Sequence, residues 1–315
     1  MKLIKCPQIL SVAIDGWRFA SETFADREKK YRRKQQWKSF FAAFIDPGFA
    51  SEWFKILMSS ELVLIAAHRK GFYLKPFRVY MSIKWNKKQK VKVIRDTYRF
   101  AIDKGDAFMQ AIICSSGFEI ARFKLSDSID GFLCLGYDHL YRKEGELVFS
   151  FYSSEFDGMI SSAAFSFEEI EGGRWLCRIG CIQGHKINDE YSAKVVQKMM
   201  NGLRPKSLII FAVQEFVRQL GFTAIYGAGD TIQVYRKKHA IHLPWMHNIE
   251  FDYNAIWVES GGQPADEGWY ELPLTMVRRG YDEMKTHKRA LYRRRYSMLD
   301  DLSLKIADTV KKIAG

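Results

Sequence analysis

The chain has 315 residues, of which 47% are hydrophobic and 27% charged, so it can bury one large core or two modest ones. Its formal net charge of +13 is clustered, which favours a partner that is a polyanion. No segment approaches the ~20 uninterrupted apolar residues of a membrane helix. The apolar run at the start is short and lacks a small-residue cleavage site. We therefore expect a cytoplasmic protein without a transmembrane segment.

The first third of the chain is predicted to be helical. Apolar residues recur at helical spacing within residues 17–24, and again within 47–58 after an Asp-Pro-Gly restart. Between them, residues 27–38 carry a run of cations that leads into Phe40, Phe41 and Phe44. A second basic cluster covers residues 84–92. We expect residues 1–104 to form a helical N-terminal region.

From about residue 107 the pattern changes to short apolar strands separated by Gly, Ser, Asp and Asn turns. Residues 105–315 are therefore predicted to form one α+β domain around a mixed or antiparallel sheet, with a basic C-terminal helix packed across it. The strands that we expect cover residues 108–114, 118–124, 131–137, 146–153, 159–169, 174–183, 222–228, 232–238, 255–259 and 269–274.

The segment from Trp175 to Asp230 carries the most information, because it predicts a central strand, a polar loop, two helices and a further strand. The first strand, residues 174–183, ends in a loop where Asn188 or Asp189 can cap a helix that stops at Gly202. Pro205 then suits the first turn of a second helix, which Gly221 terminates.

This segment contains the residues that we expect to bind an anionic ligand. Small and donor groups follow the strand, and two cations begin the second helix, which together indicate a ligand-binding group of Gln183, Gly184, Lys186, Arg204 and Lys206. Arg204 can equally cap the carbonyls of the preceding helix. The candidate catalytic residues are His185, Tyr226 and Asp230, because ligands of α/β sheets bind where strands end. A solvated His185 and a simple tight turn at residues 226–230 are the alternatives.

Four separated motifs resemble a known bacterial family. They are EGELVFSF at residues 144–151, IGCIQG at 179–184, GLRPK at 202–206, and the tail FDYNAIWVESGG…GWYELPL…KRALYRRRY. In this order they resemble the VirK/YbjX family, a domain of unknown function. The resemblance implies an association with virulence and with resistance to envelope-active antimicrobial peptides. It implies no particular reaction.

The order of elements also resembles the fold of the GNAT acyltransferases, in which amides at a helix start hold the pyrophosphate of coenzyme A. In this chain Gln183 is followed by Gly-His-Lys-Ile-Asn, which lacks the second and third glycines of the GNAT pattern. This difference disfavours ordinary acetyl-CoA binding and leaves open relatives that take acyl or aminoacyl groups from a larger carrier such as tRNA. The donors that the resemblance implies are an acyl-CoA or an aminoacyl-tRNA. The resemblance predicts an acyl or aminoacyl transferase that modifies a peptide or envelope-related acceptor.

The C-terminal helix presents a basic and aromatic stripe. Its members fall at i, i+3, i+4, i+7, i+8 and i+11, and they are Lys285, Lys288, Arg289, Tyr292, Arg293 and Tyr296. Arginine can fork onto phosphate while tyrosine stacks on bases, so the stripe predicts binding of nucleic acid such as tRNA, or of another anion. The alternative function is a non-enzymatic factor that binds nucleic acid or anionic lipid through such stripes.

Other chemistries have little support in the sequence. Five cysteines, mostly in apolar segments, are typical of reduced core thiols. His239, His242 and His247 are interrupted by Pro244, so we expect a metal-free loop and no metal site. A Gly-x-Ser-x-Gly elbow, a Walker loop and a zincin motif are absent from the sequence.

Overall fold

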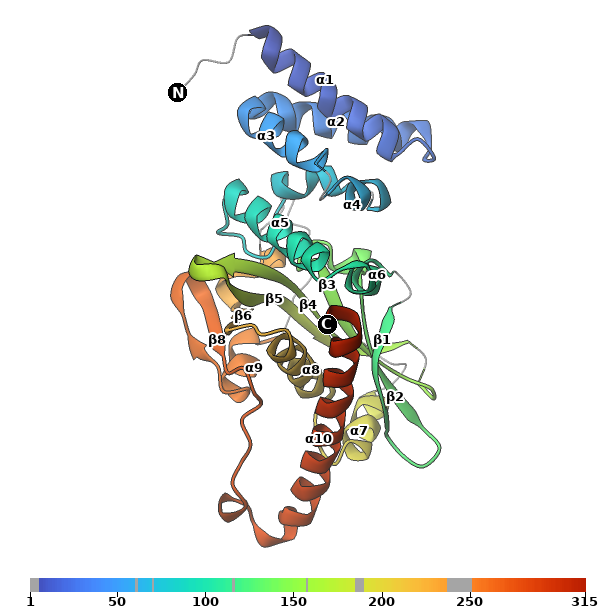
Figure 1. Ribbon diagram of the computed structural model, residues 1–315, viewed down its shortest axis with the longest axis vertical. Helices are drawn as coiled ribbons and strands as arrows, with labels where there is room; N and C mark the ends of the chain where they lie inside the picture. Colours follow the sequence, from blue (N-terminus) through green and yellow to red (C-terminus); the bar gives the residue numbers. More distant parts are fainter. Residues whose placement is uncertain are drawn as a thin grey trace. The chain divides into compact units, whose positions relative to one another are not determined.

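The computed structural model describes residues 6–59, 62–69, 71–114, 117–156, 158–184, 190–236 and 251–315. The chain divides into two compact units (Figure 1). Unit 1 comprises Met1–Val79 and Asn86–Arg99, and unit 2 comprises Tyr80–Trp85 and Phe100–Gly315. Among the described residues, no helix combines the length and the apolar composition that crossing a bilayer requires.

Unit 1 is helical. Its elements are α1 (Cys6–Thr23), α2 (Lys29–Ile45), α3 (Pro47–Leu57), α4 (Val63–His68), the 3₁₀ helix η1 (Phe72–Phe77) and most of α5 (Lys87–Asp103). The start of α3 follows from its sequence, because Pro47 occupies the first turn and the Asp46 carboxylate accepts the Phe49 amide at 3.3 Å. Trp53 of α3 is fully buried, and its Nε1 donates to the Tyr73 carbonyl at 2.7 Å.

Unit 2 is built on an eight-stranded sheet of order β1-β2-β3-β4-β5-β6-β8-β7. The strands are β1 (Phe118–Lys124), β2 (Asp130–Gly136), β3 (Leu147–Ser153), β4 (Met159–Ile170), β5 (Arg174–Gly184), β6 (Ala224–Ala228), β7 (Gln263–Pro264) and β8 (Trp269–Leu272). All neighbours are antiparallel except β5 and β6, which are parallel. A parallel pair needs a crossover connection, which the helices between β5 and β6 supply.

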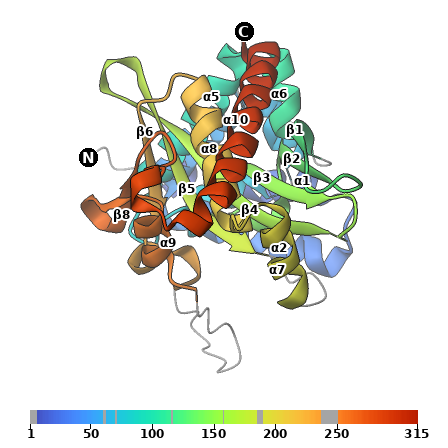
Figure 2. The same cartoon turned by 90° about the horizontal axis from the view of Figure 1, so that it is seen from below.

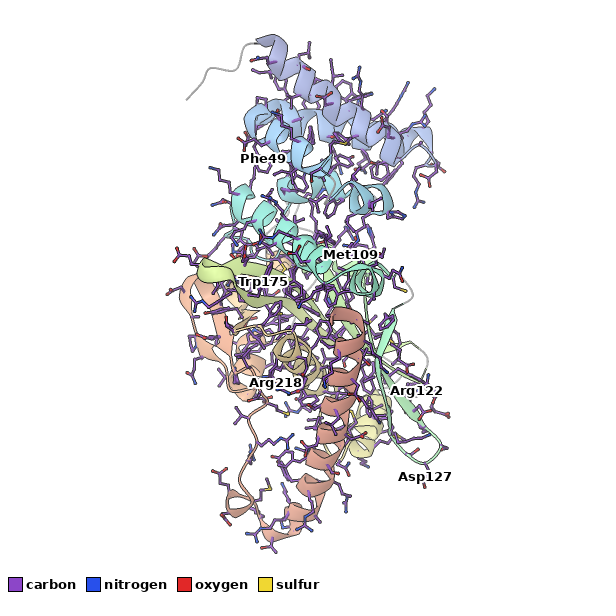
Figure 3. The ribbon with its side chains drawn as sticks, viewed as in Figure 1. Phe49, Met109, Arg122, Asp127, Trp175 and Arg218 are labelled. Carbon is purple, nitrogen blue, oxygen red and sulfur yellow. The ribbon has the colours of Figure 1, made fainter. Side chains whose placement is uncertain are left out.

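The helices of unit 2 are α6 (Asp106–Ile113), α7 (Glu190–Met199), α8 (Pro205–Gln219), α9 (Tyr253–Glu259) and α10 (Thr286–Ala314). α8 and α10 lie side by side on one face of the sheet (Figures 1 and 2). Between them and the strands, side chains fill the space (Figure 3). The rings of Phe149 and Phe165 stack with their centroids 5.9 Å apart, and the ring centroids of Phe149 and Phe216 of α8 are 5.2 Å apart. Aromatic contacts therefore form much of this core.

Strand β4 passes through the core and carries three buried serines whose hydroxyls are satisfied. The Ser161 hydroxyl donates to the Pro205 carbonyl at 3.0 Å. Ser162 lies 2.5 Å from the Tyr141 hydroxyl, and Ser166 lies 2.8 Å from the Tyr80 hydroxyl. Because an unpaired buried hydroxyl is costly, these contacts fix which segments cover each face of β4.

The predicted α+β class is confirmed, with a helical N-terminal region, a mixed and mostly antiparallel sheet and a C-terminal helix. Residues 174–183 form the central strand β5, between β4 and β6. Pro205 opens the second helix as expected, and Gly221 follows its end. The predicted helix start at Asn188 or Asp189 lies outside the described residues, and α7 is described from Glu190.

Three strand predictions were wrong. Residues 108–114 belong mainly to helix α6, where Phe108, Ala111 and Ile112 are buried at i, i+3 and i+4. Residues 255–259 lie in helix α9, which the Asp252 carboxylate caps by accepting the Ala255 amide at 2.8 Å. The described part of residues 232–238 forms short 3₁₀ turns instead of a strand. Short apolar runs fit both periodicities. A local cap favours the helix at residues 255–259, whereas at 108–114 the start of α6 has no side-chain cap and one helical side is buried.

Candidate functional site

Strands β5 and β6 separate towards their carboxyl ends. Their pairing covers Leu176–Ile179 against Ala224–Gly227, whereas β5 continues to Gly184 alongside β4 only. A bulge at Gly180 falls where the pairing with β6 stops, since Ala164 pairs with Cys181 but Phe165 pairs with Ile179. β5 thus has an edge that β6 does not cover.

Tyr253 of α9 occupies this edge. Its side chain is buried, and its hydroxyl donates to the Ile182 carbonyl of β5 at 3.2 Å. Burial raises the pKa of the Tyr253 phenol well above its usual value, so it stays a hydrogen-bond donor. The divergence of the strands is therefore filled by a tyrosine from within the same unit, and open space lies beside it.

That open space is a cavity of about 440 Å³, here called the Lys206 cavity. It lies at the end of β5, the first turn of α8, and parts of α7 and α9. The side chains and backbone that line it come from Ile160, Gly184, Lys194, Gln197, Arg204, Pro205, Lys206, Ser207, Phe251, Asp252, Ala255, Ile256 and Glu259. Its volume is in the range of small-molecule sites.

Lys206 is the distinctive group of this cavity. Its Nζ lies 3.4 Å from the centroid of the Phe251 ring, and a Cβ added at Gly184 would lie 3.0 Å from its Cε. Burial lowers the pKa of the Lys206 ammonium from 10.5 to about 8. In the described part of the chain no carboxylate forms an ion pair with it. At neutral pH the cavity thus holds a mainly protonated amine that has no anionic partner among the described residues.

The first turn of α8 adds positive potential to the same place. Arg204 precedes the helix with extended backbone and makes no side-chain cap, and the first amides of a helix lack intrahelical partners. The Arg204 guanidinium instead donates to the Glu259 carboxylate at 2.8 Å. This ion pair holds Arg204 at the rim, where side chains of the pair are 62% and 54% exposed. Together, Lys206, Arg204 and the helix start suit an anionic group.

We expect Arg204→Ala to weaken anion binding without unfolding the chain. Losing a charge-assisted hydrogen bond should cost about 1.5–3 kcal/mol of binding free energy. The exposed pair with Glu259 should contribute less than about 1 kcal/mol to stability. Calorimetric titration with pyrophosphate tests this, with Arg174→Ala at the opposite end of β5 as the control. Loss of folding with unchanged affinity would show that Arg204 has a structural role only.

The predicted ligand-binding residues divide between the two faces of the sheet. Gly184, Arg204 and Lys206 line the cavity. Gln183 pairs with Ser162 while Gly184 pairs with Ser161, and successive strand residues point to opposite faces, so the Gln183 side chain lies on the other face. Its Nε2 lies 3.9 Å from the Cys181 sulfur. Lys186 lies outside the described residues.

The candidate catalytic residues do not gather at the cavity in the described part of the chain. Asp230 instead holds the start of helix α9, because its carboxylate accepts hydrogen bonds from the backbone amides of Tyr253 and Asn254 at 3.3 Å each. Its own amide donates to the Asn254 side chain at 3.0 Å. His185 lies outside the described residues, as do His239, His242 and His247.

Tyr226 belongs to a different cluster. The Arg178 guanidinium lies 4.9 Å from the Tyr226 ring and 4.7 Å from the Trp269 ring, and it pairs with Glu168 at 2.8 Å. The next residue, Gly227, faces Trp257 of α9, so Tyr226 points away from α9. Aromatic rings thus surround the Arg178 guanidinium, so a side chain of the protein itself already occupies the space between them.

The buried cysteines of β5 are poorly suited to nucleophilic chemistry. Burial raises the pKa values of the Cys177 and Cys181 thiols well above their usual range, which disfavours the thiolate. Burial also raises the pKa of the Cys134 thiol, to about 11. Among the described residues, no group of three or more His, Cys, Asp or Glu side chains is placed to hold a metal ion.

The predicted C-terminal stripe lies on α10 and the residue before it. Lys285, Lys288 and Arg293 are exposed, and Arg289 is partly buried with its Nε 3.4 Å from the Met284 carbonyl. Tyr292 and Tyr296 are partly buried, with ring centroids 5.8 Å apart.

A second hollow, of about 570 Å³, adjoins this stripe. Its lining includes Arg278, Arg279, Arg293 and Tyr296. Tyr296 is engaged there, since its hydroxyl accepts the Arg279 amide at 3.0 Å and its ring lies 5.1 Å from the Arg278 guanidinium. Asp300, which pairs with Arg278, offsets part of the positive charge.

Three residues that line the cavity were not predicted from the sequence, namely Phe251, Glu259 and Lys194. The motif FDYNAIWVESGG begins with Phe251 and contains Glu259, yet its apolar centre predicted a strand and hid the helix that brings both residues to Arg204 and Lys206. The signal that could have found them is Asp252 followed by Asn254, which is typical of a helix start.

The fold defines an α+β protein with a mixed sheet, and the residues of the Lys206 cavity suit an anionic group. Comparison with known proteins identifies the family of the chain. A family model described as "Protein of unknown function (DUF535)" matches residues 28–308, so the chain belongs to this family, the VirK/YbjX family. The uncharacterized protein YbjX of Escherichia coli (strain K12) is 26% identical over 281 residues, covering 88% of this chain and 84% of YbjX. No solved structure matches the chain.

Two uncharacterized proteins of Haemophilus influenzae share shorter segments. One is 34% identical over 126 residues, which is 40% of this chain and 40% of that protein. The other is 27% identical over 129 residues, which is 41% of this chain and 42% of that protein. These relatives support the family and carry no activity in their names.

Proposed function

We propose that the chain is a transferase whose Lys206 cavity binds the anionic part of an acyl or aminoacyl donor. The observation that carries the proposal is the half-buried Lys206 ammonium, which lacks a carboxylate partner within the described residues and sits beside the first turn of α8. A desolvated cation is costly unless an anion accompanies it. A donor phosphate at this place would supply that anion.

The position of the cavity supports a donor with an acyl-type arm. The parallel strands β5 and β6 diverge at a bulge and are connected by helices, an arrangement that is consistent with the resemblance to GNAT transferases. Tyr253 fills the divergence, so an arm would lie along α9 and the end of β5. The acceptor, a peptide or an envelope-related molecule, would meet the donor there, and the reaction would take place in the cytoplasm.

Native mass spectrometry of the full chain with acyl-CoA and with aminoacyl-tRNA tests this function. We expect one donor class to bind, and Lys206→Met to weaken that binding at least about thirtyfold. Lys198→Met is the matched control, because Lys198 is an exposed lysine of α7 outside the cavity. If the chain binds neither donor, or if Lys206→Met and Lys198→Met bind the donor equally well, the donor assignment is refuted.

The second candidate function is a non-enzymatic factor that binds nucleic acid or anionic lipid through the C-terminal stripe. The observation that favours it is the gathering of Arg278, Arg279 and Arg293 around one hollow beside Tyr296. Guanidinium groups at such spacing suit phosphate, and the tyrosine ring offers a surface for stacking.

This second function predicts a steep dependence of tRNA binding on salt, because each neutralised phosphate releases condensed counterions. Changing Arg289 and Arg293 to Gln should reduce the slope of log affinity against log salt by about 1 for each phosphate that is no longer neutralised. Filter binding over a salt series measures it. If the unmodified chain retains no tRNA even at low salt, the nucleic-acid function fails.

A further inference from the structure

Helix α2 of unit 1 has its polarity reversed relative to a usual surface helix. Its buried residues are polar or small, namely Gln35, Gln36, Ser39 and Ala43. Its exposed residues include Trp37, Phe41, Phe44 and Ile45, which are 50%, 52%, 49% and 78% exposed. These four fall at i, i+4, i+7 and i+8, so they share one side of the helix, which we call the α2 aromatic face. A helix that hides amides and shows aromatic rings needs an apolar medium outside it.

The buried side of α2 is well packed, so the reversal is a stable feature of the fold. A Cβ added at Gly16 of α1 would meet Ser39 and Ala43 at 3.0–3.3 Å, which shows that the two helices approach closely through small residues. Within this seam the Gln36 amide donates to the Ser21 hydroxyl at 2.7 Å. The aromatic face therefore cannot turn inward without disrupting this packing.

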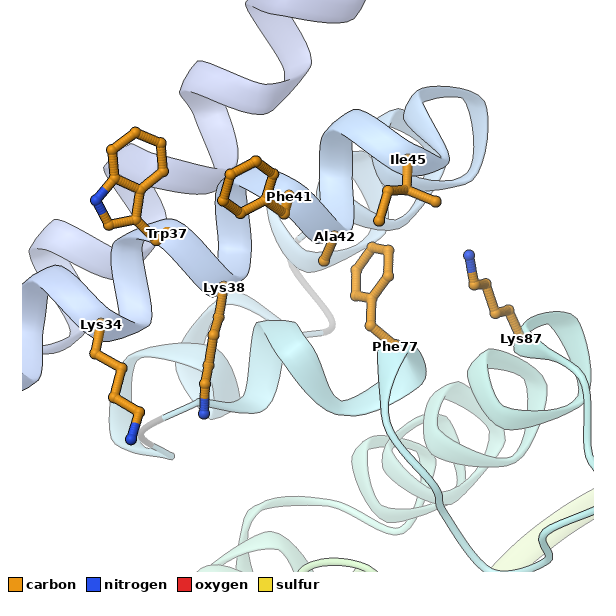
Figure 4. A pocket seen from close by; sticks show the side chains of 8 residues that line it. All are labelled: Lys34, Trp37, Lys38, Phe41, Ala42, Ile45, Phe77 and Lys87. Carbon is orange, nitrogen blue, oxygen red and sulfur yellow. The ribbon is translucent and has the colours of Figure 1, made fainter. Parts of the chain in front are cut away.

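The aromatic face is rimmed by lysines around a hollow of about 710 Å³. Figure 4 shows Trp37 and Phe41 next to each other on α2, Phe77 beneath Ile45, and the side chains of Lys34, Lys38 and Lys87 around them. Burial and the nearby charges of Arg78 and Lys34 lower the pKa of the Lys38 ammonium. Lysines that repel one another in this way gain stability when an anion approaches.

The charge of α2 selects among the occupants of this face. The helix holds six cations and no acidic residue in the sequence KKYRRKQQWKSFFAAFI. A second copy of the same face would bring further cations against these and would be repelled. Nucleic acid would match the cations but would leave Ile45 and Phe44 without an apolar partner. A bilayer surface with anionic headgroups offers both an apolar layer and negative charge.

We propose that the α2 aromatic face docks unit 1 onto anionic phospholipid surfaces. Trp37, Phe41, Phe44 and Ile45 would enter the boundary between headgroups and acyl chains, where aromatic rings are favoured. The stems of Lys34 and Lys38 would extend so that their ammonium groups meet phosphate. This binding is peripheral, and it does not depend on the function proposed for the Lys206 cavity.

Vesicle sedimentation with the full chain tests the proposal. We expect binding to vesicles of pure phosphatidylglycerol and little or none to vesicles of pure phosphatidylcholine. Ile45→Glu should weaken the binding at least about tenfold, because it removes an apolar side chain from the bilayer boundary and adds repulsion. The double variant Lys34→Gln with Lys38→Gln should also weaken it about tenfold or more, since each basic residue near the surface adds to binding.

Leu304→Glu is the matched control, because it makes the same charge change at a 67% exposed leucine on α10 of unit 2. It should bind vesicles like the unmodified chain. Trp37 fluorescence should be quenched by brominated acyl chains, and this component should disappear in Trp37→Phe. Circular dichroism confirms that each variant folds, as expected for substitutions at exposed positions.

Several outcomes would overturn the proposal. One is a lack of binding to phosphatidylglycerol, and another is equal weakening in Ile45→Glu and Leu304→Glu. Self-association that Ile45→Glu abolishes, without any vesicle binding, would identify a second copy as the occupant instead. Retention of nucleic acid through Lys34 and Lys38, without vesicle binding, would likewise replace the lipid surface.

Discussion

Gly180→Ala is expected to lower the free energy of unfolding of unit 2 by about 3 kcal/mol, at the upper end of the cost of overpacking. A Cβ built at Gly180 would lie 1.9 Å from the Glu144 carbonyl oxygen and 2.8 Å from its carbon. Both atoms belong to the backbone, so no side chain can rotate away. The turn that contains Glu144 is itself held against β4, because a Cβ at Gly145 would lie 2.5 Å from the Phe165 amide nitrogen.

Urea denaturation of the full chain, with hydrogen exchange in β4 and β5, measures this effect. Gly280→Ala is the control, because a Cβ there would meet only the Glu283 side chain, at 3.9 Å. A decrease below about 1 kcal/mol at Gly180 would mean that the bulge is loose. It would then no longer explain why β5 separates from β6 at this point.

The sequence predicts the main elements of unit 2 because their signals are local and strong. Residues 174–183 are apolar over the length of a strand, and Pro205 and Gly221 mark both ends of α8. Helix α10 follows from its long pattern, with Leu302 and Ile306 fully buried. Here propensity, periodicity and terminating residues all favour the same structure.

Short apolar segments were predicted less well, because four to eight residues fit a strand and a helix alike. For residues 108–114 the deciding feature is burial of Phe108, Ala111 and Ile112 on one helical side, which depends on contacts distant in sequence. For residues 255–259 it is the Asp252 cap together with the Asp230 carboxylate, which holds the Tyr253 amide.

The candidate site could be predicted only where its residues are close in sequence. Gly184, Arg204 and Lys206 were expected together because one strand end and one helix start carry them. Glu259 is the last residue of α9 and Phe251 lies just before this helix, some fifty residues later in the chain, so no local pattern links them to Arg204. Tyr226 and Gln183 were expected at the site, but strand alternation turns both side chains to the other face.

Lys206→Met is expected to weaken binding of an anionic donor by about 2–3 kcal/mol, roughly thirty- to 150-fold. Methionine keeps the length and the contact with Phe251 but removes the charge. Stability should not fall, because the protonated amine is partly desolvated without a carboxylate partner among the described residues. Calorimetric titration of coenzyme A and urea denaturation measure the two effects, with Lys198→Met as the control for removal of a charge.

The contribution of Lys206 to the stability of the folded chain should depend on pH. The Lys206 pKa is about 8 in the folded chain and 10.5 ordinarily. Below pH 8 the amine is protonated in both states and its burial cost is fully present. Between about 8 and 10.5 the folded chain has released a proton that the unfolded chain retains, so this group's contribution to stability rises with pH.

Donor affinity should change with pH in the opposite direction to the stability contribution of Lys206. A bound anion favours the protonated amine, so donor affinity should be highest below pH 8 and should fall as pH rises through the Lys206 pKa. Binding near pH 8 should take up protons, which titrations in buffers of different ionisation enthalpy detect. Lys206→Met should remove this uptake. If the unmodified chain binds the donor with the same affinity at pH 7 and pH 9, the Lys206 ammonium is not the group that holds the anion.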